Sequence, residues 1–142
     1  MADLRQDRAV VLEFLKRHKL ATIATVHPNG TPEAAAIDFS VRDDLEIVFD
    51  TFDDTRKYSN LTQNPAAAFV IGWDSNITVQ YEGHAEPVPA IDVARYQRYH
   101  IEHVPEEREF IERGAIVFRV RPHWIRYSDF TSDPPYIVEL TF

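Results

Sequence analysis

The pair Arg56 and Lys57 is the feature of this sequence that most directly indicates chemistry. It follows an apolar run, LEIVF, and opens a stretch with the pattern of a short helix. A cap at Asp54 or Thr55 would leave unpaired amides in the first helical turn, and these amides favour an anion together with the helix dipole. Cations placed there are unfavourable unless a negative group lies nearby. Two explanations stay open: a phosphate-binding site, or a solvated helix face neutralised by Asp53 and Asp54.

A second group of polar residues could bind a metal ion. His100 and His103 are spaced i, i+3 on an expected helix, with Glu106 and Glu107 beyond them. Such a pair can face a metal, but no third ligand is indicated, and polar helices often carry these residues. The sequence therefore predicts no metal site.

The common catalytic motifs are missing from the sequence. It contains only four glycines and no Gly-rich phosphate loop, Gly-x-Ser-x-Gly turn or His-Glu-x-x-His pair. It also has no cysteine, which excludes disulfides, thiolate metal sites and cysteine nucleophiles and favours a reducing, cytoplasmic location. We single out no catalytic side chain from the sequence.

The overall charge argues against two classes of partner. With 23 acidic and 15 basic residues the formal net charge is −8, whereas nucleic acids and anionic membranes require a basic surface. The N-terminal residues lack the apolar stretch of a secretory signal, and no run approaches the roughly 20 apolar residues of a membrane span. We expect a protein without nucleic-acid or membrane partners.

The periodicity of the chain predicts short antiparallel strands and a few helices. Strands are expected at 20–26, 33–41, 45–51, 66–73, 77–88, 115–122 and 124–130, and helices at 3–19, 55–63 and 89–113, the last broken at Pro105. This pattern favours a mostly β fold in the form of a small antiparallel barrel, in one domain spanning residues 1–142.

Three local patterns give more specific expectations. Asn29-Gly30 predicts a two-residue type I′ hairpin turn, in which both residues have positive φ. In segment 45–51, Leu45, Ile47 and Phe49 alternate with Glu46, Val48 and Asp50, which is the periodicity of a strand. Segment 66–73 is apolar throughout, which predicts a strand covered on both faces.

The order of these features resembles the pyridoxamine 5′-phosphate oxidase-like flavoproteins, which are FMN-binding split β-barrels. The resemblance rests on LATIATVHPNGTPEAAAIDFSV, then on LEIVFDT with DTRKYSNLTQNPAAAFVI, then on ITVQYEGHAEPV. It covers roughly residues 8–90, and VFRVRPHWIRYSDF is similar to the closing strands of small family members.

The resemblance implies a homodimer with two FMN molecules in grooves between the subunits. By position it implies cofactor contacts from five segments: Ala35, Ala36, Ile37 and Asp38 along the flavin ring, Asp50 and Thr51 beside the ribityl chain and phosphate, Thr55, Arg56 and Lys57 at the phosphate, Thr78 lining the flavin, and Trp124 reaching the pocket from the partner subunit.

Two departures from the family pattern limit what the resemblance implies. The second strand lacks the basic residue with which the true oxidase helps bind FMN, and no Arg-rich C-terminal segment binds a vitamin phosphate, so we do not expect pyridoxal phosphate synthesis. The implied function is an FMN-dependent oxidoreductase acting on a small molecule. A flavin carrier or sensor without turnover and a deazaflavin-dependent reductase stay open, and so does haem as the ligand.

Overall fold

The computed structural model describes residues 3–142, so the first two residues of the expected domain lie outside it. The helices are α1 (Leu4–Lys16), α2 (Arg56–Gln63), α3 (Val93–His103) and α4 (Arg108–Glu112), with 3₁₀ turns at Ala90–Asp92 and Pro105–Glu107. The strands are β1 (Leu20–Val26), β2 (Pro32–Asp38), β3 (Ser40–Val41), β4 (Ile47–Thr51), β5 (Ala66–Ile71), β6 (Ile77–Pro87), β7 (Ile116–Asp129) and β8 (Tyr136–Thr141).

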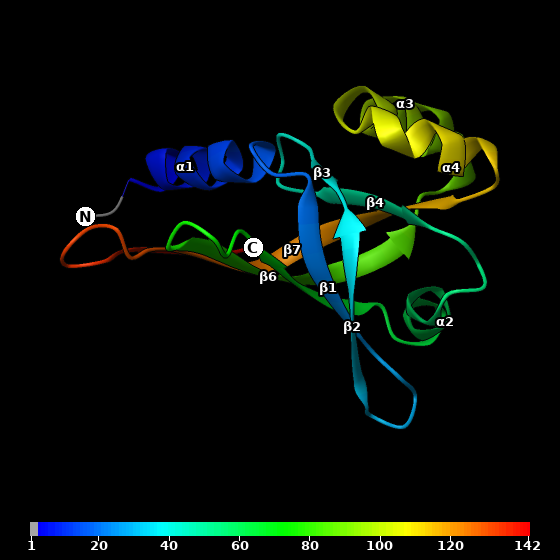
Figure 1. Cartoon of the computed structure of the whole chain (residues 1–142), viewed down its shortest axis with the longest axis horizontal. Coiled ribbons are helices and arrows are strands. Elements are labelled where there is room, and N and C mark those ends of the chain that lie inside the picture. The colour runs from blue at the N-terminus through cyan, green and yellow to red at the C-terminus, as the bar shows by residue number, and fades with distance from the viewer. Residues whose placement is uncertain (1–2) are drawn as a thin grey trace.

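The strands form one antiparallel eight-stranded sheet in the order β2-β1-β5-β6-β7-β4-β3, and β8 pairs with β7. The sheet curls into a half-barrel, with α2 at one side and the α3–α4 segment at another (Figure 1). The expected mostly β split barrel is confirmed. None of the helices within residues 3–142 is both long enough and apolar enough to cross a membrane.

Strand β7 corrects the expectation of two separate closing strands. It runs unbroken from Ile116 to Asp129 and pairs with β6 on one side along most of its length. The register between them shifts at Glu82/Gly83, where a β-bulge lets the long strands stay paired through Pro122. The proline thus lies at an irregularity in the ladder rather than at a chain break.

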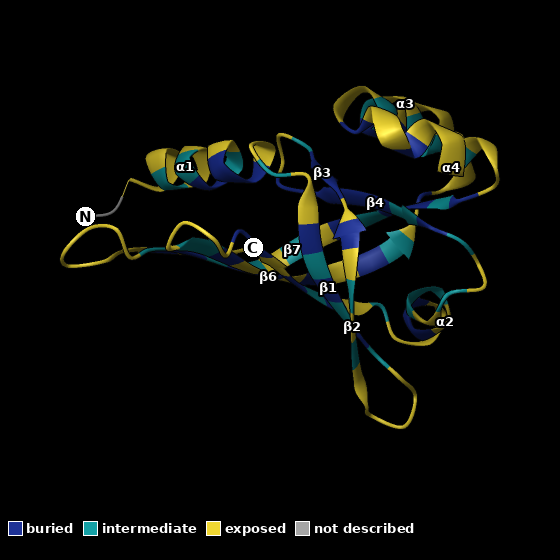
Figure 2. Cartoon of the chain, in the orientation of Figure 1, coloured by how far each residue is buried: buried dark blue, intermediate teal, exposed yellow. Residues whose placement is uncertain are grey.

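The 45–51 and 66–73 segments contain strands, as expected, but it is β4 and not β5 that is covered on both faces. In β4, Ile47, Val48 and Phe49 are all fully buried (Figure 2), because Val48 packs in a second apolar cluster with Tyr96 of α3 while its neighbours face the main core. In β5, by contrast, burial alternates and Val70 is exposed. Which faces are covered depends on helices that are distant in sequence, so a local pattern could not decide it.

The β1–β2 connection is a hairpin, as expected, but not a two-residue type I′ turn. Gly30 has φ of 91°, whereas Asn29 does not adopt a positive φ. The amide of His27 donates to Thr31 O at 2.9 Å and the amide of Gly30 donates to His27 O at 2.8 Å, which encloses a three-residue loop. This is a tight turn followed by a left-handed glycine, the next most common hairpin connection.

The helices differ from their expected bounds mainly at the ends. Helix α1 is capped by Asp3, whose carboxylate accepts from the amides of Arg5 and Gln6, and it ends at Lys16 rather than at residue 19. Its buried face is Val11, Phe14 and Leu15. The expected break at Pro105 is confirmed, because α3 ends at His103 and a 3₁₀ turn starts at the proline.

Candidate functional site

The start of helix α2 is fixed to the end of strand β4 by two threonines. Thr55 is the N-cap, and its hydroxyl accepts from the amide of Tyr58 at 3.3 Å. The Thr55 hydroxyl also lies 2.8 Å from that of Thr51, the last residue of β4. The first turn of α2 and the end of the strand therefore form one surface, on which the unpaired helical amides are available to a ligand.

Asn60 holds the same helix against the β1–β2 hairpin. Its side chain is buried, and its amide nitrogen donates to Thr25 Oγ1 at 3.0 Å and to Glu33 Oε1 at 2.8 Å. A buried amide with two partners stabilises one placement of the helix on the sheet. Asn60 was quoted within the sequence motif, but this positioning role was not predicted.

Arg56 and Lys57 differ in their surroundings. The Arg56 guanidinium lies 2.9 Å from the Glu33 carboxylate, and its side chain is 73% exposed. Lys57 is more enclosed: burial lowers the pKa of its ammonium below the ordinary value, and the nearby Asp50 carboxylate offsets part of this effect. A partly desolvated ammonium gains more from an anionic partner than a solvated one.

Two adjacent cavities bring most of the predicted residues together. The larger, of about 320 Å³, is lined by residues of β2, β4 and the start of α2, among them Ala36, Ile37, Asp38, Asp50, Thr51, Thr55 and Lys57. The smaller, of about 100 Å³, is lined on β2 and α2 by Ala35, Glu33 and Arg56 and shares Lys57 with the larger one. Nine of the eleven predicted positions thus line one or the other of two cavities, which share Lys57.

Thr78 and Trp124 lie elsewhere on the sheet. Thr78 pairs with Ser128 on β7, and Trp124 pairs with Glu82 on β6 and Thr141 on β8. In the part of the chain that the structure describes, neither residue lines either of the two cavities. Their contact with a cofactor stays a prediction, which for Trp124 places the cofactor against a partner subunit.

Three residues that line the larger cavity were not predicted from the sequence. Phe52 follows β4, and Glu107 and Phe110 come from the segment after the Pro105 break. The rings of Phe52 and Phe110 pack edge-on at 6.3 Å between centroids. Because this segment is far from β4 in sequence, its approach to the cavity could not be read from local patterns.

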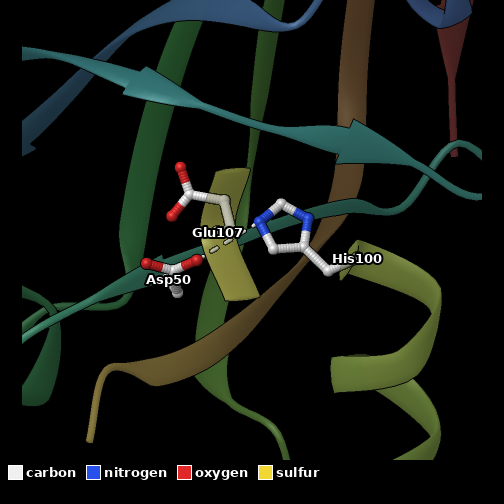
Figure 3. A group of neighbouring side chains, drawn as sticks. All are labelled: Asp50, His100 and Glu107. Atoms are coloured by element: carbon white, nitrogen blue, oxygen red, sulfur yellow. Dashed lines mark ion pairs between the residues drawn. The ribbon is translucent and has the colours of Figure 1, made fainter. Parts of the chain in front are cut away.

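Asp50, His100 and Glu107 meet beside the larger cavity, although they come from β4, α3 and the 3₁₀ turn after Pro105 (Figure 3). His100 Nε2 lies 3.4 Å from Asp50 Oδ2, and the ligand atoms of all three residues lie within 4.8 Å of one another. Burial, followed by the carboxylates of Asp50 and Asp38, raises the pKa of Glu107 from 4.5 to about 9.

His100 and His103, whose helical spacing would allow them to face one metal ion, point to different surroundings in the structure. The His103 ring is exposed, its Nδ1 lies 2.8 Å from Tyr99 O, and it stacks on the Tyr99 ring. His100 instead turns into the protein, where its ring is fully buried. The signal for the observed cluster, a histidine and a glutamate on either side of a proline break, was present but incomplete, because the third member is on β4.

A comparison with known protein families places most of the chain in one of them. The family model of pyridoxamine 5′-phosphate oxidase matches residues 8–129. This chain belongs to the pyridoxamine 5′-phosphate oxidase family. The match spans the β1–β2 hairpin, the start of α2 and the whole of β7, and thus all of the residues that line both cavities.

A curated relative is similar to part of this chain. The chain is 37% identical over 83 residues to a pyridoxine/pyridoxamine 5′-phosphate oxidase of Gloeothece citriformis, covering 58% of this chain and 38% of that one. It therefore spans about two fifths of the length of this curated relative.

Two solved structures show the shared fold. A heme binding protein from Mycobacterium smegmatis aligns with TM-score 0.80 at 17% identity, over 99% of this chain and 59% of that one. An FMN binding protein related to pyridoxamine 5′-phosphate oxidase, from Nostoc punctiforme, aligns with TM-score 0.69 at 14% identity, over 100% and 98%. At these identities the alignments establish the fold alone.

Proposed function

We propose that this member of the pyridoxamine 5′-phosphate oxidase family binds FMN and acts as an oxidoreductase on a small molecule. The observation that carries the proposal is the pair of cavities that meet at Lys57. They bring β2, the end of β4 and the first turn of α2 into one binding region, as a cofactor with a ring at one end and a phosphate at the other requires.

The phosphate end fits the residues at the start of α2. Lys57 supplies a partly desolvated cation, the two adjoining hydroxyls of Thr51 and Thr55 supply hydrogen-bonding groups, and the helix start supplies backbone amides. Phosphate binding at such a helix start combines charge-assisted hydrogen bonds with the helix dipole. Arg56 is a weaker contributor, because Glu33 already pairs with its guanidinium.

The ring end fits strand β2. Ala35 in the smaller cavity and Ala36 in the larger one have small side chains, which allow a flat ring to approach the backbone of the strand closely. Ile37 lines the larger cavity with Ala36. FMN, when bound, supplies the hydride and electron chemistry, and the protein supplies orientation and electrostatics. Asp38 at the end of β2 gives the cavity a polar group that can orient the ring or a substrate.

We also propose that the protein is a homodimer. Ala34 and Ala36 are exposed on β2, which ends the sheet order, and Leu20 and Val70 on neighbouring β1 and β5 are exposed as well. Apolar strand surface of this kind is typically covered by a partner. A second copy could then bring Thr78 or Trp124 to the cavity, and light scattering that gives the mass of one chain at micromolar concentration would contradict the dimer.

The absorption spectrum of the purified protein, with mass analysis of the released ligand, tests the cofactor. Released FMN supports the proposal, whereas a deazaflavin or haem would replace it with one of the two alternatives. Reduction of the bound flavin by a nicotinamide cofactor, followed by reoxidation with a defined acceptor, then separates an oxidoreductase from a carrier or sensor. A flavin that no donor reduces would favour the carrier.

A further inference from the structure

The cluster of Asp50, His100 and Glu107 contains two buried polar atoms that the protein itself leaves without a hydrogen bond. These are Asp50 Oδ2 and His100 Nε2, which have no hydrogen-bond partner in the part of the chain that the structure describes and contact only each other, as an ion pair when the histidine is protonated. Their side chains are 7% and 0% exposed. Buried polar atoms normally have hydrogen-bond partners. Two such atoms that face each other without a hydrogen bond therefore indicate a missing group that contacts both.

The spacing of these atoms fits a shared metal ion better than a direct contact. The distance of 3.4 Å between His100 Nε2 and Asp50 Oδ2 is longer than that of a normal charge-assisted hydrogen bond. Two ligands at about 2.0–2.2 Å from one tetrahedral ion are themselves about 3.3–3.5 Å apart. The ligand atom of Glu107 lies within 4.8 Å of both, which is close enough to complete the set with a small rotation of its flexible side chain.

Ser40 on β3 provides the support that a metal-binding histidine requires. Its hydroxyl lies 2.7 Å from His100 Nδ1, and both side chains are buried. When Nδ1–H donates to Ser40 Oγ, the Nε2 lone pair points at Asp50 and is free to bind a cation. A hydrogen bond of this kind fixes the tautomer and ring orientation in metal sites.

We propose that Asp50, His100 and Glu107 bind a divalent first-row transition metal ion, with Zn²⁺ as the reference ion. One imidazole and two carboxylates are a ligand set suited to Zn²⁺ and its neighbours, whereas Mg²⁺ and Ca²⁺ prefer oxygen ligands alone. Three protein ligands leave a fourth position for water or substrate.

The ion lies at the wall of the larger cavity, because Asp50 and Glu107 line that cavity while His100 lies behind them. Asp38 is a third carboxylate in the same lining. A divalent cation would offset these negative charges next to the region that we assign to an anionic cofactor. The metal site is independent of that assignment, since its ligands are complete without a flavin.

The test is metal titration of the tag-free full chain after treatment with chelator, without added flavin. Calorimetry with Zn²⁺ and the visible absorption of tetrahedral Co²⁺ should both give one equivalent per chain. Loss of a ligand in His100→Ala or Glu107→Gln should weaken binding by more than about a hundredfold, and loss of the supporting hydroxyl in Ser40→Ala by about ten- to a hundredfold.

The matched control is His103→Ala, which removes a histidine from the same helix one turn away. The His103 ring is outside the cluster, so the metal affinity of the His103→Ala variant should equal that of the wild type. Because His100 is fully buried, circular dichroism must show that His100→Ala folds; if it does not, the nearly isosteric Glu107→Gln decides. Failure of the wild type to bind one equivalent, or equal binding by wild type and Glu107→Gln, would overturn the proposal.

Discussion

Lys57 is expected to be the residue on which FMN affinity depends most. In the free protein its ammonium is partly desolvated, which lowers its pKa, and Asp50 provides only partial compensation. A phosphate dianion would supply the missing partner. Arg56 starts from a different state, because its guanidinium is largely exposed and already lies 2.9 Å from Glu33. Truncating Lys57 should therefore weaken FMN binding more than truncating Arg56.

The expected loss follows from one charge-assisted hydrogen bond. Such a bond contributes about 1.5–3 kcal/mol, so Lys57→Ala should weaken FMN binding by about ten- to a hundredfold. The assay is titration of the flavin-free protein followed by flavin fluorescence. Lys19→Ala removes the same charge from an exposed residue outside both cavities and should leave the affinity unchanged. An unchanged affinity in Lys57→Ala, or an equal loss in Lys19→Ala, would refute the reasoning.

Three further predictions concern stability, each measured by urea unfolding. A Cβ at Gly83 would lie 2.5 Å from Arg121 O, so Gly83→Ala should destabilise the fold by about 1–3 kcal/mol, and a neutral result would show that the bulge adapts. Thr55→Ala removes the α2 cap and should destabilise by about 1 kcal/mol; no loss would mean that water replaces the hydroxyl. In metal-free protein the raised pKa of Glu107 means that the folded state holds a proton between pH 4.5 and about 9 that the unfolded state has lost. The free energy of unfolding of the wild type should therefore decline as the pH rises across this range, relative to that of Glu107→Gln. Parallel pH profiles of the two proteins would contradict the raised pKa.

The parts of the site that are local in sequence could be predicted from the sequence. The start of α2 and the two cations of its first turn follow from residue types within one short segment, whereas the sequence offered Asp54 or Thr55 as the cap and the structure shows Thr55. The hairpin that carries Ala35 and Ala36 was also predicted, although its turn has three residues and one left-handed glycine rather than two. Local hydrogen bonding and turn chemistry determine these features.

The parts that depend on distant packing could not be predicted. Val48 is buried because Tyr96 of α3 covers its face of β4, which no periodicity within β4 encodes. The same packing turns His100 towards Asp50, 50 residues earlier in the chain, and the Pro105 break returns Glu107 to that point. Helical spacing alone suggested that His100 and His103 could face one metal ion, an option that the sequence did not favour. In the structure only His100 turns inward, because tertiary contacts decide which side of α3 faces the protein.

The most direct test of the proposed cofactor is a comparison of FMN with riboflavin on the flavin-free wild-type protein. The two ligands share the ring and ribityl chain and differ in the phosphate alone. If Lys57, Thr55 and the start of α2 bind that phosphate, FMN should bind at least about tenfold more tightly than riboflavin, and added salt should narrow the difference. Equal affinity for the two ligands, or no binding of either, would contradict the account.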